Sequence, residues 1–459
     1  RMMDLICRFQ WEEQETGAGN KMQENGQEQA ARRIRAVLYL VNAGNKELSG
    51  TYCLQTPLEA QPFGKREICF GTLSAGETLE LPMEFQFSSG GCHLFLGWLK
   101  GRETEYLWKW PVRLGGSGFY SGDTHTHSLY SDGKGTLSEN RDAMFEKGHS
   151  FLYSTDHNTI KQAEEIKTFE EEDRKRGFLH LTGWEFTTKF GHSIAYGTKI
   201  PQDPLQITER GDAGAWQEYI DGRNREKGIV YLCHPYEAPI YEFGEAVLDS
   251  VRDIAGIEVW NGYNHHALAY QNRKAFAKWD ELNVSRGLKL SGNAVSDAHT
   301  SKKQGDPYIK GILSELTEAE IHRMLKSGAF FGSNGPEIRF TINDAGIGED
   351  CRISGKTLVH GRLTVFDPLG QLEEIILHRG MRQDRTETLA RKKIRKILDV
   401  FPVGEERIVW TKDWYFYAEP GDFYRVEVIS GQNLAGFNGS ERTEEKGFAY
   451  TNPIWMEER

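Results

Sequence analysis

Short apolar runs alternate with longer amphipathic segments in the middle of the chain, from about residue 118 to 335. Each apolar run is rich in β-branched or aromatic residues and ends in polar ones, a pattern that predicts a strand. Such strands are expected at residues 119–128, 150–157, 178–188, 192–198, 229–235, 256–262 and 288–299. Helices are expected between them, for example at residues 137–148, 160–177 and 268–287. This alternation indicates an α/β fold with a parallel sheet or barrel, and seven strands suit a barrel slightly smaller than the eight-stranded β/α type.

Both ends of the chain carry short β-type runs separated by polar or glycine-rich turns, for example residues 34–44 and 423–430. This spacing is typical of β-sandwiches. The polar stretch 12–32 is expected to be a long exposed loop, and the Gly-Gly-Ser-Gly run at 115–118 a joint between domains. The sequence thus predicts an N-terminal β-sandwich-like domain (1–117), a central β/α barrel (118–335) and a C-terminal β domain (336–459).

Composition narrows the classes of protein to consider. The chain has 459 residues and a formal net charge of -11, which argues against non-specific binding to nucleic acid or to an anionic membrane. No stretch approaches the roughly 20 apolar residues of a membrane helix, and the N-terminal sequence does not resemble a secretion signal. The six cysteines are dispersed without a CxxC spacing, so we expect reduced thiols and a cytoplasmic protein.

Histidines and carboxylates gather at the ends of the predicted strands, where β/α barrels normally build their active sites. His125 and His127 end the first strand. Because side chains alternate along a strand, both are expected to share one face with Asp123 and could hold one metal ion. Asp132 lies in a turn five residues past His127 and can fold back toward the same ions.

The next two strands end in the same way. His157 ends the second strand, and its neighbour Asp156 is expected to orient a histidine or to cap the following helix. Glu185 lies on an otherwise apolar strand, where a charge is costly unless it is paired or bound to metal. Since a carboxylate can bridge two cations, Glu185 is the candidate bridge, with His192 following after a turn.

The remaining candidates lie toward the end of the central segment. His234 ends the fifth strand, and adjacent Cys233 is expected to be a buried apolar filler. Asp297 and His299 end the last strand with the one-residue spacing of the first pair. Each motif alone is weak evidence, but together they place a histidine or carboxylate at six of seven strand ends and predict a metal centre.

These motifs resemble those of the polymerase and histidinol phosphatase (PHP) superfamily, and HTHSLYSDG, STDHN and the EFTTxxGH pattern look closest to its carbaryl-hydrolase-like branch. The resemblance covers about residues 118–335 and implies a distorted seven-stranded barrel with two or three Zn, Mn or Fe ions. The ligand sets that it implies are His125, His127, Glu185 and Asp297 for one ion; Asp132, His157 and His299 for a second; and Glu185, His192 and His234 for a third. Asp132 stands where several relatives have histidine, and a carboxylate favours harder cations.

The expected function is metal-dependent hydrolysis, because bound cations lower the pKa of water to about 7 and clamp the oxygens of an ester. Asp297 is the candidate proton acceptor, and the candidate substrate-binding residues are Lys189, Tyr236, Asn261 and His265. Small phosphoesters are favoured as substrates, with carboxylic or carbamate esters as the alternative. A second class of function remains open, a non-catalytic binding protein with a relic barrel.

Overall fold

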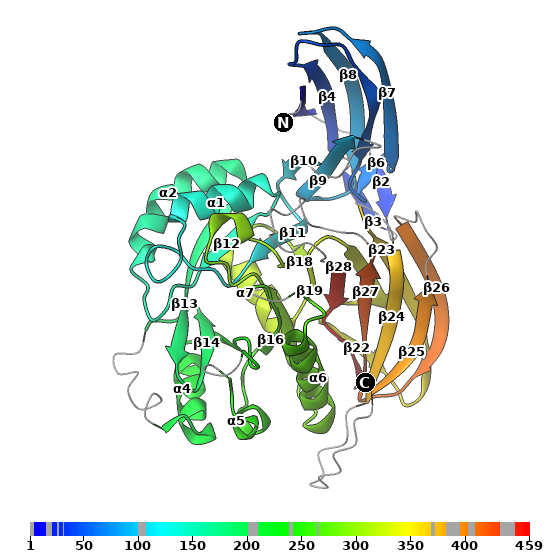
Figure 1. The fold of residues 1–459 in the computed structure, drawn as a ribbon. Helices are drawn as coiled ribbons and strands as arrows, with labels where there is room; N and C mark the ends of the chain where they lie inside the picture. The colour runs from blue at the N-terminus through cyan, green and yellow to red at the C-terminus, as the bar shows by residue number, and fades with distance from the viewer. Residues whose placement is uncertain are drawn as a thin grey trace.

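The computed structural model describes residues 4–14, 21–24, 27–30, 32–99, 107–200, 210–237, 242–263, 266–368, 372–381, 395–402, 409–431 and 446–459. A unit of mixed strands and helices lies at the left of Figure 1, and the strands of the N-terminal and C-terminal regions lie at the upper right and lower right. Within the described residues, no helix is long and apolar enough to cross a membrane. The fold is therefore mixed α/β, with a large mixed sheet and additional antiparallel sheets.

The N-terminal region packs two sets of antiparallel strands around an apolar core. One set is β1 (Leu5–Gln14), β4 (Arg32–Asn42), β8 (Thr78–Phe87) and β6 (Ala60–Gln61); the other is β5 (Leu48–Gln55), β7 (Lys65–Leu73), β9 (Gly90–Leu99) and β10 (Leu107–Leu114). Strand β4 buries every second residue, among them Leu38 and Leu40, as a half-buried strand should. The predicted loop 12–32 is corrected in part, because β2 (Lys21–Glu24) and β3 (Gln27–Ala30) pair in a hairpin. Backbone hydrogen bonds form this ladder, and they need no apolar sequence pattern.

Each of the seven strand segments predicted in the middle of the chain contains a strand. These are β11 (Gly118–Asp123), β12 (Phe151–Ser154), β13 (Leu179–Thr188), β14 (Gly191–Tyr196), β15 (Ile229–Leu232), β16 (Gly256–Asn261) and β17 (Ser291–Val295). Each strand pairs with the next along the chain, and a bridge between Thr126 and Ala298 joins the first strand end to the last. The pairing is parallel except around β14, which is antiparallel to both neighbours. A two-residue turn joins β13 to β14, too short for the crossover that a parallel pair requires.

Helices between these strands complete the central unit. They are α1 (Leu137–Glu146), α2 (Gln162–Arg176), α4 (Ala213–Arg225), α5 (Glu245–Ser250), α6 (Tyr270–Ser285) and α7 (Glu318–Ser327), with a short 3-10 turn at Ser301–Lys303. Thr136 and Glu139 form a capping box at the start of α1, and Gly177 ends α2 with a left-handed backbone. The core of the unit includes four fully buried tryptophans, namely Trp184, Trp216, Trp260 and Trp279.

The C-terminal region is built of strands and packs on the central unit. Strands β18 (Tyr308–Leu313) and β19 (Phe330–Ser333) flank α7 in the central unit. The elements of the C-terminal region are β20 (Glu337–Ile342), β21 (Ala345–Gly346), β22 (Asp350–Ile353), β23 (Thr357–Phe366), β24 (Leu372–Met381), β25 (Arg395–Pro402), β26 (Val409–Ala418), β27 (Asp422–Ser430), β28 (Gly447–Thr451) and β29 (Ile454–Glu458). Strand β18 runs antiparallel to β11, and β19 pairs with β28. Tyr450 of β28 stacks edge-on against Phe276 of α6, with ring centroids 4.8 Å apart. The pairing of β9 with β11 crosses the predicted boundary at 117, and the pairing of β19 with β28 crosses the one at 335. The two domain limits therefore stay predictions.

Candidate metal centre

The nine predicted metal ligands lie at the same ends of the central strands. Glu185 and His192 are on β13 and β14, whereas the other seven follow the strands: His125, His127 and Asp132 after β11, His157 after β12, His234 after β15, and Asp297 and His299 after β17. The prediction that the two paired motifs are strand residues is corrected, since β11 ends at Asp123 and β17 at Val295. Both pairs nevertheless reach the cluster, because Thr126 and Ala298 pair with each other between them.

Glu185 lies at the centre of the cluster, and each of its carboxylate oxygens faces a different set of histidines. Oε2 is 3.3 Å from His125 Nε2, 3.3 Å from His127 Nε2 and 2.9 Å from His157 Nδ1. Oε1 is 2.7 Å from His192 Nδ1 and 3.2 Å from His234 Nε2. This arrangement is the one that a carboxylate bridging two or more cations requires.

Asp297 completes the buried end of the cluster. Its Oδ1 lies 3.0 Å from His127 Nε2 and 3.4 Å from His125 Nε2, and its Oδ2 accepts a hydrogen bond of 3.0 Å from Asn261 Nδ2. One oxygen is thereby held by the protein while the other faces the two imidazoles. Four potential ligand atoms, from His125, His127, Glu185 and Asp297, therefore converge on one point.

Asp132 occupies the open side of the cluster. It lies 3.2 Å from His299 Nε2, 3.5 Å from His157 Nε2 and 3.8 Å from His127 Nδ1, and its side chain is 57% exposed. These four residues form a group in which one ligand atom from each lies within 4.8 Å of the others. The group contains the second ligand set that the family resemblance implies, together with His127.

The buried ligand atoms fit a bound cation. Glu185 Oε2 and Asp297 Oδ1 are buried and accept no well-oriented hydrogen bond from any described residue, although imidazole nitrogens lie within 3.4 Å. The Nε2 atoms of His125 and His127 are only 3.1 Å apart. Buried acceptors of this kind are costly unless a proton or a metal ion satisfies them. Imidazole and carboxylate are both common ligands of divalent metal ions in proteins.

Without a cation the cluster must hold protons instead. Burial raises the pKa of Glu185, but the neighbouring His125, His192 and His157 outweigh it and keep that pKa well below its usual range. Burial lowers the pKa of His125, yet Asp297, Glu258 and Glu185 raise it well above its usual range. Binding of a divalent ion would displace protons from the imidazoles, so metal affinity is linked to pH.

Glu258 orients the first imidazole, and the sequence did not single it out as part of the site. Its Oε1 lies 2.7 Å from His125 Nδ1, and its Oε2 accepts hydrogen bonds from the His234 backbone N–H at 2.9 Å and from Asn261 Nδ2 at 3.2 Å. A carboxylate on Nδ1 keeps the proton there and turns the Nε2 lone pair toward the cluster. The available signal was a buried carboxylate on an apolar strand, which equally fits a structural role.

Two aspartates near the ligands have structural roles. Asp123 was expected to share a face with His125, but it accepts hydrogen bonds from the backbone N–H groups of His125, Ser296 and Gly305, and the expectation is corrected. The chain leaves the strand geometry after Asp123, so the alternation of side chains does not continue. Asp156 does not cap α2, whose N-cap is Lys161. It accepts hydrogen bonds from Ser128 and Ser131 and so holds the loop that carries His127.

Two ligands have unusual backbones. His234 has φ 23° and Asp297 has φ 48°, values that residues other than glycine rarely adopt. Such conformations persist where the surrounding structure determines them and are concentrated at functional sites. Adjacent Cys233 is fully buried, and burial raises its thiol pKa well above the usual range. Its thiol also lies in a group with His125 and Glu258 whose potential ligand atoms are within 4.8 Å of one another, so the predicted filler role stays a prediction.

The predicted substrate-binding residues are placed differently from one another. Lys189 is exposed on the turn between β13 and β14, and the Tyr236 hydroxyl donates to Glu245 at 3.1 Å. Asn261 orients Asp297, as described above, and His265 lies outside the described residues. Tyr263, which the sequence reading missed, is 38% exposed, and its ring lies 4.5 Å from that of His299. An aromatic residue just past the strand end at 256–262 was the signal that could have identified it.

Comparisons with known proteins give distant matches among solved structures alone. The sequence matches no protein-family profile and no curated protein. Among solved structures, the chain is distantly similar to PHP-like metal-dependent phosphoesterases and amidohydrolases. A Bacteroides vulgatus two-domain protein containing a predicted PHP-like metal-dependent phosphoesterase matches with 14% identity and a TM-score of 0.39, over 74% of this chain and 96% of that one.

Two further matches are more partial. An amidohydrolase from Chromobacterium violaceum has 17% identity and a TM-score of 0.28, over 39% of this chain and 87% of its own. A lesion-specific endonuclease from Pyrococcus furiosus has 15% identity and a TM-score of 0.30, over 46% of this chain and 56% of its own. All three TM-scores are below 0.5, and any function for this chain rests on the cluster itself.

Proposed function

We propose that this protein is a metal-dependent hydrolase of the PHP type, with strands β11 to β17 forming the distorted seven-stranded barrel of that superfamily. The observation that carries the proposal is the position of Glu185, whose two oxygens face five imidazoles from four chain segments. A structural ion pair needs one partner, whereas this arrangement concentrates ligands for more than one ion.

The bound ions would supply an activated water and stabilise the charge that develops on the ester oxygens. The chain's own residues position these parts. Glu258 orients His125, and Asn261 fixes Asp297 through Oδ2, which leaves Oδ1 directed into the cluster. We assign to Asp297 Oδ1 the role of accepting a proton from the attacking water.

Small phosphoesters are the substrate class we propose, following the motif resemblance, with carboxylic or carbamate esters as the alternative. The ligand cluster is buried on one side and opens at Asp132, where the side chain is 57% exposed. Tyr263 is 38% exposed, and its ring lies 4.5 Å from that of His299. Lys189 is exposed on the turn that precedes His192. We therefore expect the substrate to enter on the Asp132 side.

Metal analysis combined with ester hydrolysis tests the proposal. The protein would be assayed with Mn, Zn or Fe on p-nitrophenyl phosphate, bis-p-nitrophenyl phosphate and p-nitrophenyl acetate. We expect phosphoester turnover that a chelator abolishes. His125→Ala should remove it without unfolding the chain, and His360→Ala on β23, a half-buried histidine paired with Asp413, should not.

The possible results separate the levels of the proposal. Activity on the acetate ester alone would overturn the phosphoester assignment but would still support the assignment as a hydrolase. Metal-replete protein that is inert toward every ester would overturn the hydrolase itself and favour the relic-barrel alternative.

A further inference from the structure

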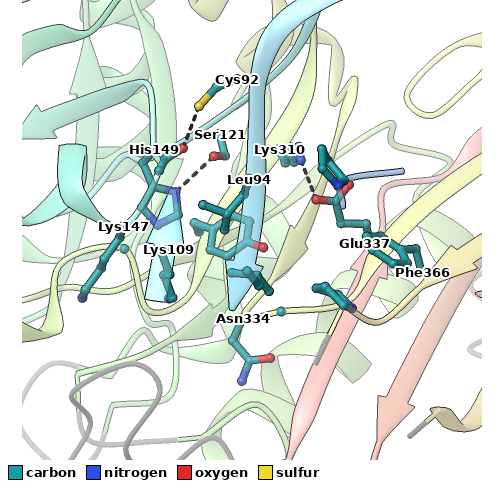
Figure 2. Close-up of a pocket in the computed structure, with 17 residues that line it drawn as sticks. Cys92, Leu94, Lys109, Ser121, Lys147, His149, Lys310, Asn334, Glu337 and Phe366 are labelled. Atoms are coloured by element: carbon teal, nitrogen blue, oxygen red, sulfur yellow. Dashed lines mark hydrogen bonds and ion pairs between the residues drawn. The ribbon is translucent and has the colours of Figure 1, made fainter. Parts of the chain in front are cut away.

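The hydroxyl of Tyr263 makes no hydrogen bond to any described residue, although this exposed tyrosine lies beside the metal centre. The cavity lined by residues of β9, β10, β11 and β18 shows the opposite case, because its polar side chains bond to one another (Figure 2). There the Ser121 hydroxyl lies 3.1 Å from His149 Nδ1, and Lys310 donates to Glu337 at 2.6 Å. An exposed hydroxyl can bond to water, but one beside potential metal ligands can also bond to a substrate.

Tyr263 packs on the ligands at the open side of the centre. Its ring centroid lies 4.5 Å from that of His299, and His299 Nε2 lies 3.2 Å from Asp132 Oδ2. Burial, and then the charges of Asp297, Asp132 and Glu237, raise the pKa of Tyr263. The hydroxyl therefore lies in the electrostatic field of carboxylates from two of the proposed ligand sets. A phenol with an ordinary pKa of about 10 is already protonated at neutral pH and is a hydrogen-bond donor there.

The backbone that carries Tyr263 is held by the same side chain that orients Asp297. The Tyr263 N–H donates to Asn261 Oδ1 at 3.0 Å, and Asn261 Nδ2 donates to Asp297 Oδ2 at 3.0 Å. A Cβ atom on the intervening Gly262 would lie 2.5 Å from the Asp306 carbonyl oxygen, so the turn is closely packed and requires glycine. The position of Tyr263 relative to Asp297 is thus fixed by the protein, as a preorganised catalytic group requires.

Positive charge next to the ligand carboxylates comes from histidines. Every ion pair that Asp132, Glu185 and Asp297 form with a described residue has an imidazole as its partner. An imidazole nitrogen that binds a metal ion has no proton to donate to a substrate. An oxygen that gains charge during ester cleavage is then stabilised further only by donors that are not ligands, and a neutral hydroxyl is such a donor.

We propose that Tyr263 is a catalytic residue of this centre, whose hydroxyl donates a hydrogen bond to the ester oxygen on which negative charge develops. The inference rests on the proposed hydrolase function. The phenol keeps its proton throughout, and the proton of the attacking water goes to Asp297 as assigned above. Because the hydrogen bond strengthens as the charge develops, it lowers the barrier more than it improves substrate binding.

Two matched substitutions separate the hydroxyl from the ring. Tyr263→Phe removes the hydroxyl and keeps the ring that packs on His299. Tyr417→Phe, at a 60% exposed tyrosine of β26, is the control for the loss of a phenol. Metal stoichiometry and competition with a chelator are measured on each full-length protein before any assay. We expect both variants to bind metal as tightly as the parent chain does.

The hydroxyl is tested with the metal-loaded proteins in two ways. With p-nitrophenyl phosphate, kcat of Tyr263→Phe should fall on the order of 100-fold with little change in KM, because the lost donor acts on charge formed in the transition state. Calorimetric titration with inorganic phosphate gives a measurement without turnover. Tyr263→Phe should bind phosphate about tenfold more weakly, because a hydrogen bond to a charged oxygen is lost. Tyr417→Phe should match the parent in both experiments.

The inference is overturned if the parent is active and Tyr263→Phe hydrolyses the ester and binds phosphate as the parent does. It is also overturned if Tyr263→Phe loses metal affinity in proportion to its activity, since Tyr263 would then act through His299 rather than on the substrate. Failure of the proposed function gives a different result, because the metal-loaded parent itself would hydrolyse none of the esters. A parent chain that neither hydrolyses an ester nor binds phosphate overturns both.

Discussion

Replacing Glu258 by glutamine tests how far a residue that touches no proposed ion controls the metal centre. In the native arrangement Glu258 Oε1 accepts a hydrogen bond from His125 Nδ1, and Oε2 accepts hydrogen bonds from the His234 backbone N–H and from Asn261 Nδ2. Glutamine has the same shape but only one acceptor oxygen. If that oxygen faces His125, the new NH₂ group meets the N–H groups of His234 and Asn261. If the amide is reversed, the NH₂ group forces a proton from His125 Nδ1 to Nε2, which points into the cluster.

Either orientation carries a cost that can be estimated. Loss of an outer partner of a metal-binding histidine typically weakens metal affinity about 10- to 100-fold, which corresponds to roughly 1.4–2.8 kcal/mol. The donor group left facing another donor costs a further ~1–3 kcal/mol of folding free energy, because the site is fully buried. We therefore expect Glu258→Gln to bind metal about 10- to 100-fold more weakly than the parent and to unfold at a lower urea concentration.

Competition with a chromophoric chelator measures the affinity, and urea unfolding of the chelated protein measures the stability. Glu164→Gln, at an exposed glutamate of α2 paired with Lys167, is the control for the loss of a carboxylate. If Glu258→Gln binds Zn and Mn as tightly as Glu164→Gln does, then the contact to His125 does not control the ligand. The argument for an oriented imidazole would then be wrong.

Three further changes probe other parts of the molecule. Asp132→Asn should lower the metal stoichiometry measured by mass spectrometry and leave the Tm of the chelated protein unchanged, because this carboxylate is 57% exposed. Burial, and then the charge of Arg141, lower the pKa of His180 to about 3. Below pH ~6.5 the imidazole is therefore protonated in the unfolded chain but stays neutral in the folded chain. Stability is thus lost as pH falls from about 6.5 toward 3, and His180→Gln should reduce the loss measured by urea unfolding at about pH 4.5 by roughly 2–3 kcal/mol. Trp279→Ala should lower the unfolding free energy by about 3–5 kcal/mol, since the ring is fully buried and its Nε1 donates to the Leu290 carbonyl at 2.7 Å.

The candidate ligands could be predicted from the sequence because their types and positions are local signals. An imidazole or carboxylate directly after an apolar run lies at the end of a strand, and strands of one sheet end together. This reasoning brings together His125, His157 and Asp297 without any knowledge of the pairing. The partners of these ligands carry no such signal. Glu258 meets His125 across 133 positions of sequence, and only the pairing of the strands in space decides which imidazole it faces.

Local backbone geometry was the second thing that the sequence could not supply. The expectation for Asp123 assumed that a strand continues through His127, but the chain turns after Asp123 and directs that carboxylate to the backbone of Ser296 and Gly305. At the other end of the unit, Asp297 reaches the cluster with a left-handed backbone at φ 48°. Residue patterns predict which face of a regular strand a side chain lies on, but they do not predict side-chain direction beyond the end of the strand.

The antiparallel strand β14 explains how a single carboxylate can face so many imidazoles. In a parallel pair, the next ligand would arrive only after a helix and from the adjacent strand end. The short turn after β13 instead returns the chain at once and places His192 directly opposite Thr187. Because cross-strand partners share a face and side chains alternate along a strand, His192 lies on the same face as Glu185 and 2.7 Å from its Oε1. Oε1 is then occupied from within the hairpin, and Oε2 is left to the histidines that follow β11 and β12. The one departure from parallel order among the seven strands thus adds His192 to the imidazoles that Glu185 faces from other strand ends.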